Sequence, residues 1–206
     1  MAKIKICGIT TLGDALACAA AGADALGFNF YRGSQRYVHP ERVREITRQL
    51  PPEILTVGVF VDEPSPEVIR YVADVANVTA VQLHGDESPE YCTALTNKFV
   101  IKVVHPNKDH RELTQYKTSA LMVDTFDEHE RGGTGRLSDW SFARKLIQLT
   151  PRLFLAGGLS PENVADAVKI VEPYAVDACS ALESSPGKKD PDRVRAFVEA
   201  VRRVKR

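Results

Sequence analysis

The chain has 206 residues, 44% of them hydrophobic and 26% charged, which is the composition of an ordinary folded domain. Lysine plus arginine and aspartate plus glutamate both total 27, so the bulk charge indicates neither a nucleic-acid partner nor an anionic membrane surface. No apolar run is long enough to span a bilayer and the N-terminus lacks a signal-peptide pattern, so we expect one cytoplasmic domain over residues 1–206.

Short runs of apolar, often β-branched residues alternate along the chain with longer amphipathic segments. We predict eight strands, at Lys3–Cys7, Ala25–Phe28, Leu55–Val61, Ala80–Leu83, Val100–Val104, Ala120–Asp124, Leu153–Ala156 and Ala175–Ala178. Helical periodicity predicts eight helices between and after them, at Leu12–Ala21, Glu41–Leu50, Pro66–Ala76, Pro89–Leu95, His110–Tyr116, Trp140–Leu149, Pro161–Val171 and Asp192–Val204. Four of these helices are preceded by a capping residue and a proline, namely Ser65-Pro66, Ser88-Pro89, Ser160-Pro161 and Asp190-Pro191.

This alternation predicts an α/β fold in which a helix follows each strand. Eight such units in about 200 residues fit a single (β/α)8 TIM barrel, at the small end of that fold's size range. The near-continuous apolar character of the strands is typical of a parallel sheet that is buried on both faces. An open, doubly wound sheet remains the alternative, because periodicity alone does not distinguish it from a barrel.

Polar residues and glycines follow the strands, at the ends where a barrel of parallel strands carries its active site. The first predicted strand ends at Cys7 and the sixth at Asp124. A cysteine at a strand end is most often a buried structural thiol, and an aspartate there often forms a turn, so neither residue alone identifies a catalytic site. We interpret Cys18, Cys92 and Cys179 as structural thiols, because the four cysteines lack the spacing of a zinc site or a disulfide framework.

Three loops at the same ends contain residues suited to binding an oxyanion. The loop after the sixth strand contains Gly132-Gly133-Thr134-Gly135, the seventh strand runs into Gly157-Gly158, and the eighth leads to Ser180. Glycines let backbone N–H groups approach an anion closely, and barrel enzymes commonly bind phosphate after strands seven and eight. Glycine pairs also serve ordinary turns, but the three loops together favour a phosphate site.

Seven segments form an ordered set along the chain. They are Lys5-Ile6-Cys7-Gly8-Ile9-Thr10, Ser34-Gln35-Arg36, Val57-Gly58-Val59-Phe60-Val61, Val81-Gln82-Leu83-His84-Gly85, Val123-Asp124-Thr125 with the Gly132–Gly135 loop, Ala156-Gly157-Gly158-Leu159-Ser160-Pro161-Glu162-Asn163-Val164, and Pro186-Gly187-Lys188-Lys189-Asp190. Taken together, the set resembles the phosphoribosylanthranilate isomerase family of tryptophan biosynthesis. The resemblance spans essentially the whole chain.

The resemblance implies an aldose–ketose isomerase, an intramolecular oxidoreductase, that converts N-(5'-phosphoribosyl)anthranilate into 1-(2-carboxyphenylamino)-1-deoxyribulose 5-phosphate by an Amadori rearrangement. It implies Cys7 as the base, Asp124 as the acid and Arg36 as the partner of the anthranilate carboxylate, which a planar guanidinium suits. Further implied substrate contacts are Gly133, Gly135, Gly157, Gly158, Asp177, Ser180 and Ala181. We expect no metal or cofactor, a small phosphosugar as the partner, and a monomer or homodimer.

The chain departs from the family after the eighth strand. Cys179 stands where the family usually has serine, and Ala181 replaces a glycine beside the expected phosphate, where a Cβ would disfavour a positive φ. The implied acid–base pair also demands unusual protonation, because a free thiol has a pKa of about 8.5 and a free aspartic acid one of about 3.9. The site must therefore lower the pKa of Cys7, raise that of Asp124, or react through a minor protonation state.

Four other functions remain open on the sequence. The related isomerase of histidine biosynthesis performs the same rearrangement but is expected to have an aspartate in place of Cys7. Indole-glycerol-phosphate synthase needs a catalytic lysine at a strand end, and Lys102 lies inside the fifth predicted strand. A barrel that binds a phosphosugar without turning it over, and a redox protein that pairs Cys7 with Cys179, are the other two. We expect His84 to make structural hydrogen bonds rather than to act in catalysis.

Overall fold

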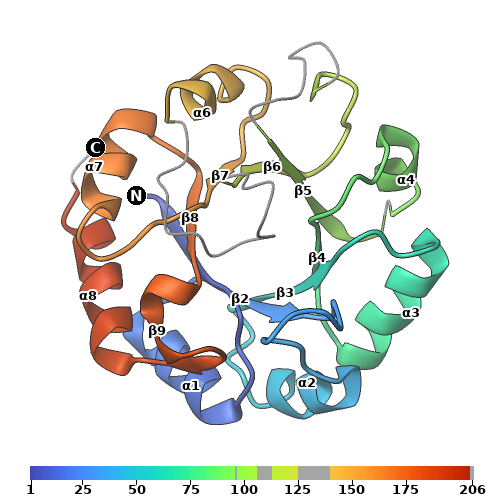
Figure 1. Ribbon diagram of the computed structural model, residues 1–206, viewed down its shortest axis with the longest axis horizontal. Helices are drawn as coiled ribbons and strands as arrows, with labels where there is room; N and C mark the ends of the chain where they lie inside the picture. The colour runs from blue at the N-terminus through green and yellow to red at the C-terminus, as the bar shows by residue number, and fades with distance from the viewer. Residues whose placement is uncertain (96, 106–112, 125–139, 205–206) are drawn as a thin grey trace.

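The computed structural model describes residues 1–95, 97–105, 113–124 and 140–204. Eight parallel strands form a closed barrel, in which each strand pairs with the next and β8 returns to pair with β1 (Figure 1). This closure excludes the open sheet and confirms the predicted TIM barrel. The strands are β1 (Lys3–Ile6), β2 (Ala25–Asn29), β3 (Leu55–Phe60), β4 (Ala80–Leu83), β5 (Phe99–Val104), β6 (Ala120–Val123), β7 (Leu153–Leu155) and β8 (Ala175–Ala178).

Helices surround the barrel on its outer side (Figure 1). They are α1 (Leu12–Ala21), α2 (Pro40–Thr47), α3 (Pro66–Ala76), α4 (Pro89–Thr93), α6 (Trp140–Leu146), α7 (Val164–Val171) and α8 (Pro191–Arg202). The predicted bounds of α1 and α3 are correct, and every strand begins and ends within one residue of its prediction. The helix predicted at His110–Tyr116 lies in part outside the described residues.

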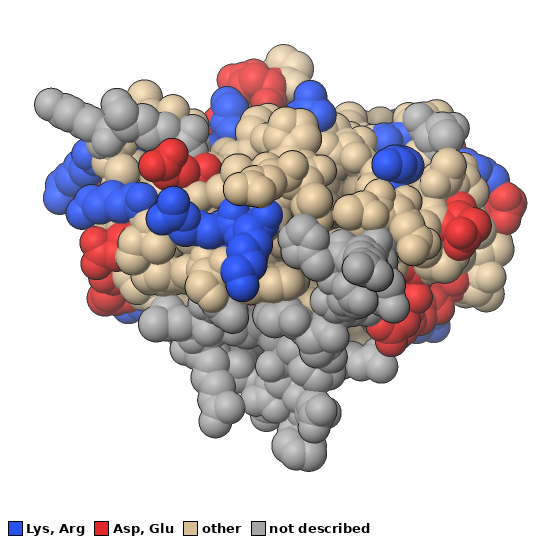
Figure 2. All heavy atoms as spheres, turned by 90° about the horizontal axis from the view of Figure 1, so that it is seen from above, with Lys and Arg blue, Asp and Glu red and all other residues tan. Residues whose placement is uncertain are grey.

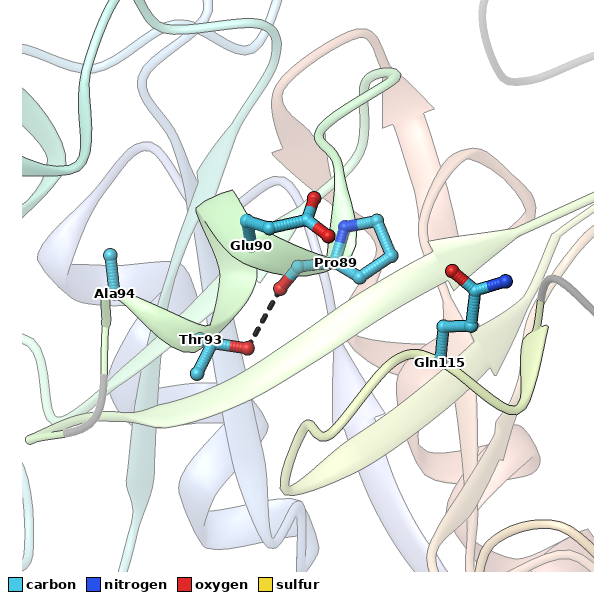
Figure 3. A pocket seen from close by; sticks show the side chains of 5 residues that line it. All are labelled: Pro89, Glu90, Thr93, Ala94 and Gln115. Atoms are coloured by element: carbon cyan, nitrogen blue, oxygen red, sulfur yellow. Dashed lines mark hydrogen bonds between the residues drawn. The ribbon is translucent and has the colours of Figure 1, made fainter.

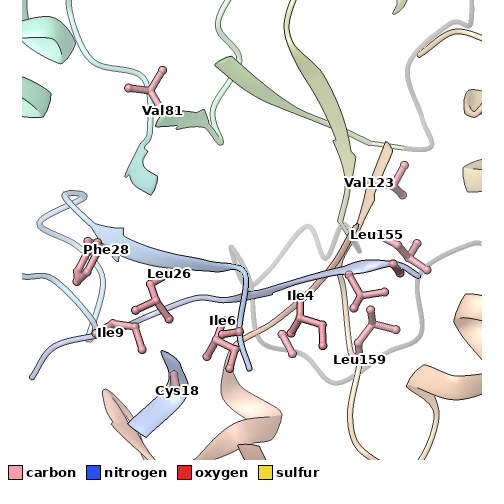
Figure 4. Close-up of a cluster of buried hydrophobic side chains, with 14 of the residues drawn as sticks. Ile4, Ile6, Ile9, Cys18, Leu26, Phe28, Val81, Val123, Leu155 and Leu159 are labelled. Atoms are coloured by element: carbon pink, nitrogen blue, oxygen red, sulfur yellow. The ribbon is translucent and has the colours of Figure 1, made fainter. Parts of the chain in front are cut away.

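The period-2 alternation of the strands separates two apolar layers. Ile4 and Ile6 point outward, into a large buried cluster that the strands share with the surrounding helices (Figure 4). Val57 and Met122 belong to a second, smaller cluster inside the barrel. Since Lys5 alternates with Ile4 and Ile6 along β1, its side chain faces the barrel interior, and the same parity applies to the residue that follows the strand.

The sequence analysis predicted four helix starts from a capping residue followed by a proline. Two of these starts are confirmed together with their capping hydrogen bonds, and one is wrong. The side chains of Ser88 and Asp190 accept hydrogen bonds from backbone N–H groups in the first turns of α4 and α8. However, α7 begins at Val164, with Asn163 as its N-cap, and not at Pro161. Asn163 Oδ1 accepts a hydrogen bond from the backbone N–H of Ser160 at 2.9 Å, so this segment folds into a side-chain-stabilised turn before the helix starts.

A small hairpin that the sequence analysis missed follows β8. The chain makes a 3-10 turn at Ser180–Leu182 and then two short antiparallel strands, β9 (Glu183–Ser185) and β10 (Lys188–Lys189). Strands of two and three residues are too short to show a hydrophobic period. The hairpin returns the chain to the barrel mouth, where Lys189 Nζ donates to the carbonyl oxygen of Cys179 at 3.2 Å.

Acidic and basic side chains both occur on the face shown in Figure 2, in keeping with the equal totals of the two charge types. Within the described parts of the chain, none of the helices is long and apolar enough to cross a membrane.

Candidate active site

Cys7 lies at the mouth of the barrel, directly after β1. Its backbone N–H donates to the carbonyl oxygen of Ala178 at 2.9 Å, which extends the hydrogen-bond ladder between β1 and β8 by one residue. Gly27 of β2 is the neighbour on the other side, and a Cβ at Gly27 would lie 2.7 Å from the Cys7 sulfur. A side chain on β2 at this position would displace the thiol, so the glycine is part of what shapes the site.

A buried ion pair lies beside the thiol, one inward-facing position further down the barrel. Lys5 is fully buried, and its Nζ donates to Asp177 Oδ1 at 3.0 Å. The Cβ position of Gly27 that lies 2.7 Å from the Cys7 sulfur also lies 3.2 Å from the Lys5 Nζ. The ammonium is therefore close to the sulfur as well as to the carboxylate. A lysine is costly to bury without compensating anions, and here two candidates for that role are adjacent.

The surroundings of Cys7 hold its pKa well below that of an ordinary thiol. The largest cause is a hydrogen bond from the Cys179 thiol, and the charges of Lys5 and Lys189 act in the same direction against the opposing effect of burial. The same hydrogen bond, together with burial, raises the pKa of Cys179, so this second sulfur keeps its proton. The described residues therefore favour a thiolate at Cys7, which is one of the routes that the sequence analysis left open.

The Lys5 ammonium is shared between two anionic groups. Burial disfavours the charged form of Lys5, but the charges of Asp177 and Cys7 outweigh it and raise the pKa of this lysine. Burial raises the pKa of Asp177 to about 7, with Lys5 opposing the shift and the charges of Cys7 and Asp124 adding to it. Asp177 thus interacts electrostatically with both residues that the sequence predicts to be the base and the acid.

Asp124 follows β6 and is in contact with His84, which follows β4. The two side chains approach to 3.5 Å between His84 Nε2 and Asp124 Oδ2. On the other side of the imidazole, Nδ1 lies 3.0 Å from Nε2 of Gln82. His84 therefore links the Gln82 amide to the Asp124 carboxyl group at the mouth of the barrel.

Arg36 is held against Glu183 by a two-point ion pair. Its Nε donates to Glu183 Oε1 at 2.9 Å and its Nη2 donates to Glu183 Oε2 at 2.7 Å, while Lys189 Nζ donates to Glu183 Oε1 at 2.9 Å. The Glu183 side chain is 3% exposed and that of Arg36 is 21% exposed, so the carboxylate is the buried anchor of the pair. Because Glu183 occupies the Nε–Nη2 edge of the guanidinium, a ligand carboxylate would have to approach the Nη1 side.

The loops after β7 and β8 contain the other predicted substrate contacts. Gly157 and Gly158 have φ values of 83° and 66°, a backbone conformation that favours glycine, and Asn163 Nδ2 donates to the Gly158 carbonyl oxygen at 2.9 Å. Ser180 is exposed and Ala181 lies next to it in the 3-10 turn. Ala181 is not among the non-glycine residues with positive φ, so its backbone conformation is compatible with a side chain. Gly133 and Gly135 lie outside the described residues.

Lys102 and a hollow beside α4 are separate from the predicted site residues. Lys102 of β5 is buried in an ion pair with Glu87, at 2.8 Å between Lys102 Nζ and Glu87 Oε2, and it also donates to the carbonyl oxygen of Gly85. It is therefore engaged outside the barrel interior, which removes the candidate lysine of a synthase. A shallow hollow beside α4 contains none of the predicted site residues; it is lined by Pro89, Glu90, Thr93, Ala94 and Gln115 (Figure 3). No group of three or more potential metal ligands occurs in the described ranges.

The structure brings together four groups that the sequence analysis did not assign to the site. They are Lys5, Lys189, Glu183 and the Cys179 thiol. The parity of β1 was a usable signal for Lys5, since Ile4 and Ile6 alternate with it. Lys189 belongs to one of the segments that carry the family resemblance, but strand parity gave no comparable signal for it, because its position at the mouth depends on the short hairpin.

Comparisons with known proteins agree with this architecture. The family model described as N-(5'-phosphoribosyl)anthranilate (PRA) isomerase matches residues 4–200. An N-(5'-phosphoribosyl)anthranilate isomerase from Geobacter sp. (strain M21) is 47% identical over 206 residues, covering 99% of this chain and 100% of the relative. The crystal structure of phosphoribosyl anthranilate isomerase from Thermotoga maritima superposes with a TM-score of 0.90 at 41% identity, covering 98% of this chain and 99% of the other. A crystal structure of such an isomerase in complex with reduced 1-(o-carboxyphenylamino)-1-deoxyribulose 5-phosphate has a TM-score of 0.86 at 41% identity, covering 98% and 99% of the two chains.

Proposed function

The chain belongs to the N-(5'-phosphoribosyl)anthranilate isomerase family of tryptophan biosynthesis, and we propose that it carries out this isomerisation with Cys7 as the base and Asp124 as the acid. The observation that carries the proposal is the placement of the Cys7 sulfur next to the buried ammonium of Lys5 at the barrel mouth. The cations beside Cys7 lower its pKa and so favour the thiolate, which is the form that can accept a proton from carbon.

The reaction begins with ring opening. Asp124, protonated, donates its proton to the furanose ring oxygen, the bond from that oxygen to C1 breaks, and the anilino nitrogen lone pair forms an iminium with C1. His84 supports this step by holding the Asp124 carboxyl group in position. The resulting positive charge on nitrogen acidifies the proton on C2.

The second step is proton abstraction at carbon. The Cys7 thiolate removes the C2 proton, the electron pair left on C2 moves into a C1–C2 double bond, and the iminium becomes an enolamine, which tautomerises to the ketone. Before this step, the neighbouring cations stabilise the thiolate of Cys7, which is the reactive form of the base. During the step Cys7 becomes a neutral thiol, and the cations lose one of the anions beside them. Asp177 offers a compensating charge, because its pKa of about 7 lets it ionise beside Lys5 when Cys7 is neutral.

The two anionic ends of the substrate bind at different parts of the mouth. The anthranilate carboxylate pairs with Arg36 on the side of the guanidinium that Glu183 leaves open. The phosphate binds at Gly157, Gly158, Ser180 and Ala181, the loops after β7 and β8 that serve this purpose in many barrels, together with Gly133 and Gly135. We also propose that residues 1–206 form one domain that works in the cytoplasm as a monomer or homodimer.

The test is a turnover assay on variants of the acid and the base. Phosphoribosylanthranilate is generated in situ and the loss of its fluorescence is followed for the wild type, Cys7→Ser and Asp124→Asn. We expect each variant to lose at least about a thousandfold in kcat with KM within a few-fold of wild type, since both residues act on the transition state. Cys92→Ser is the matched control, because Cys92 is a buried residue of α4 and its pKa is raised by burial to about 11. Near-normal turnover in Cys7→Ser or Asp124→Asn would exclude that residue from its role.

A further inference from the structure

Two cysteines meet at the barrel mouth, one of which is the proposed catalytic base. β1 and β8 are paired in register, with Ile6 opposite Ala178, and Cys7 and Cys179 are the next residue on each strand. Parity turns both side chains toward the barrel interior. Neighbouring strands are about 4.8 Å apart, which lies within the range of about 4.4–6.8 Å between the Cα atoms of a disulfide.

The backbone next to Cys7 lies against the Cys179 sulfur, and each of the two thiols shifts the pKa of the other. A Cβ on Gly8, the residue that follows Cys7, would lie 2.8 Å from the Cys179 sulfur. Gly8 has a φ of 76°, and its lack of a side chain leaves the space that Cys179 occupies.

The two sulfurs also differ in the way that an attacking and a resolving thiol differ. Cys7 is partly exposed and stands beside Lys5 and Lys189, so it is the nucleophile. Cys179 is partly exposed too and keeps its proton, with Lys189 Nζ at 3.9 Å and Glu183 Oε1 at 3.8 Å from its sulfur. The remaining cysteines, Cys18 and Cys92, are buried, and burial raises their pKa values to about 12 and about 11.

We propose that Cys7 and Cys179 form a reversible disulfide when the protein meets hydrogen peroxide, and that this bond switches the enzyme off. The Cys7 thiolate attacks the peroxide, forming an S–O bond while the O–O bond breaks, so Cys7 becomes a sulfenic acid and hydroxide leaves. The Cys179 sulfur then attacks the Cys7 sulfur, the S–S bond forms as the S–O bond breaks, and the Cys179 proton leaves with the oxygen as water. The two thiols lose two electrons in total and the peroxide gains two. A dithiol reverses the bond by exchange.

Mass spectrometry tests the bond independently of activity. The protein is treated with a few equivalents of hydrogen peroxide and alkylated under denaturing conditions. We expect an intact mass that corresponds to two alkylated cysteines and the loss of two hydrogens. Trypsin links peptide 6–32 to peptide 170–188. Because Cys18 shares the first peptide with Cys7, fragmentation of the linked pair must assign the bond to Cys7. Conversion of Cys7 to sulfinic acid in the wild type, without the cross-link, overturns the proposal.

The effect on turnover rests on the proposed function of Cys7 and has its own readout. Peroxide should reduce activity at least about tenfold in parallel with the cross-link, and dithiothreitol should restore it. In Cys179→Ser the sulfenic acid lacks its partner, so Cys7 should gain two oxygen atoms and the loss should resist dithiothreitol. Cys92→Ser should behave as the wild type. A cross-linked protein with full activity would contradict the role of Cys7 as the base, whereas an absent cross-link contradicts only the redox proposal.

Discussion

Removing the buried ammonium beside Cys7 is the most direct test of how the site maintains a thiolate. Lys5→Met keeps the length and apolar stem of the side chain but deletes the charge that Asp177 and Cys7 share. In the variant, Asp177 loses its partner at 3.0 Å, and we expect it to take up a proton rather than remain as a buried anion, since its pKa is already about 7. The variant should therefore fold at pH 6.

The size of the effect on Cys7 follows from the separation of the charges. At a separation of about 5 Å and an effective dielectric constant of about 20, one charge pair is worth about 3 kcal/mol, which corresponds to a pKa change of about two units. Part of this is offset, because a neutral Asp177 no longer repels the thiolate. We therefore expect the pKa of Cys7 to rise by one to two units in Lys5→Met, on the order of the Coulomb estimate.

The pKa of Cys7 is measured as the midpoint of its iodoacetamide alkylation rate against pH, with the modified residue identified by mass. Lys102→Met is the matched control, because Lys102 is also a fully buried strand lysine in an ion pair, but its partner is Glu87, which is not one of the predicted site residues. We expect Lys102→Met to lose stability and leave the Cys7 midpoint in place. A folded Lys5→Met protein whose midpoint stays within about 0.3 units of wild type would refute the electrostatic account of the base.

Two further predictions concern the carboxylates around the site. In wild type the folded state keeps the Asp177 proton up to a pH of about 7 while the unfolded chain releases it near 3.8, so this group makes unfolding free energy fall as pH rises between these values. Asp177→Asn should remove that slope, which amounts to a difference in unfolding free energy on the order of 4 kcal/mol across the window. Urea titrations at pH 4.5 and 7.5 measure it. If the unfolding free energy changes equally with pH in the wild type and the variant, the prediction is wrong. Glu183→Gln should destabilise the protein by about 3 kcal/mol and raise KM more than it lowers kcat, because Arg36 and Lys189 lose their shared anchor; a variant with unchanged KM would show that Glu183 does not position Arg36.

Most of the fold follows from local patterns. The strands are short apolar runs bounded by glycine, proline or charged residues, and these runs specify both position and length. Closure of the barrel is a property of the whole chain, since it depends on β8 pairing with β1, and the sequence indicated it only through the number of units. The start of α7 was mispredicted because Asn163 competes with Ser160 as the cap, and its amide satisfies the backbone of the preceding turn.

The candidate site was predictable where a residue follows a strand directly. Cys7 and Asp124 follow β1 and β6, so their placement needs only the strand ends and the barrel rule. The cations around them were harder to predict. Lys189 reaches the mouth through a hairpin of five strand residues. Part of this hairpin carries the family resemblance, but its strands are too short for a hydrophobic period to predict where the lysine lies. The position of Arg36 depends in the same way on Glu183, which lies 147 residues away in the sequence.

The two buried strand lysines show how far strand parity alone can be taken. In β1 the apolar residues Ile4 and Ile6 face the helices, so Lys5 must face the interior, in line with the cysteine two residues later. In β5 the apolar residues Ile101 and Val103 belong to the interior cluster, so Lys102 must face outward, where Glu87 meets it. Both lysines lie in strands and both are buried, yet only Lys5 faces the same side of its strand as the cysteine that follows it. A lysine two residues before a cysteine at the end of a barrel strand is therefore a sequence signal for a stabilised thiolate, and a lysine of opposite parity is a signal for a structural ion pair.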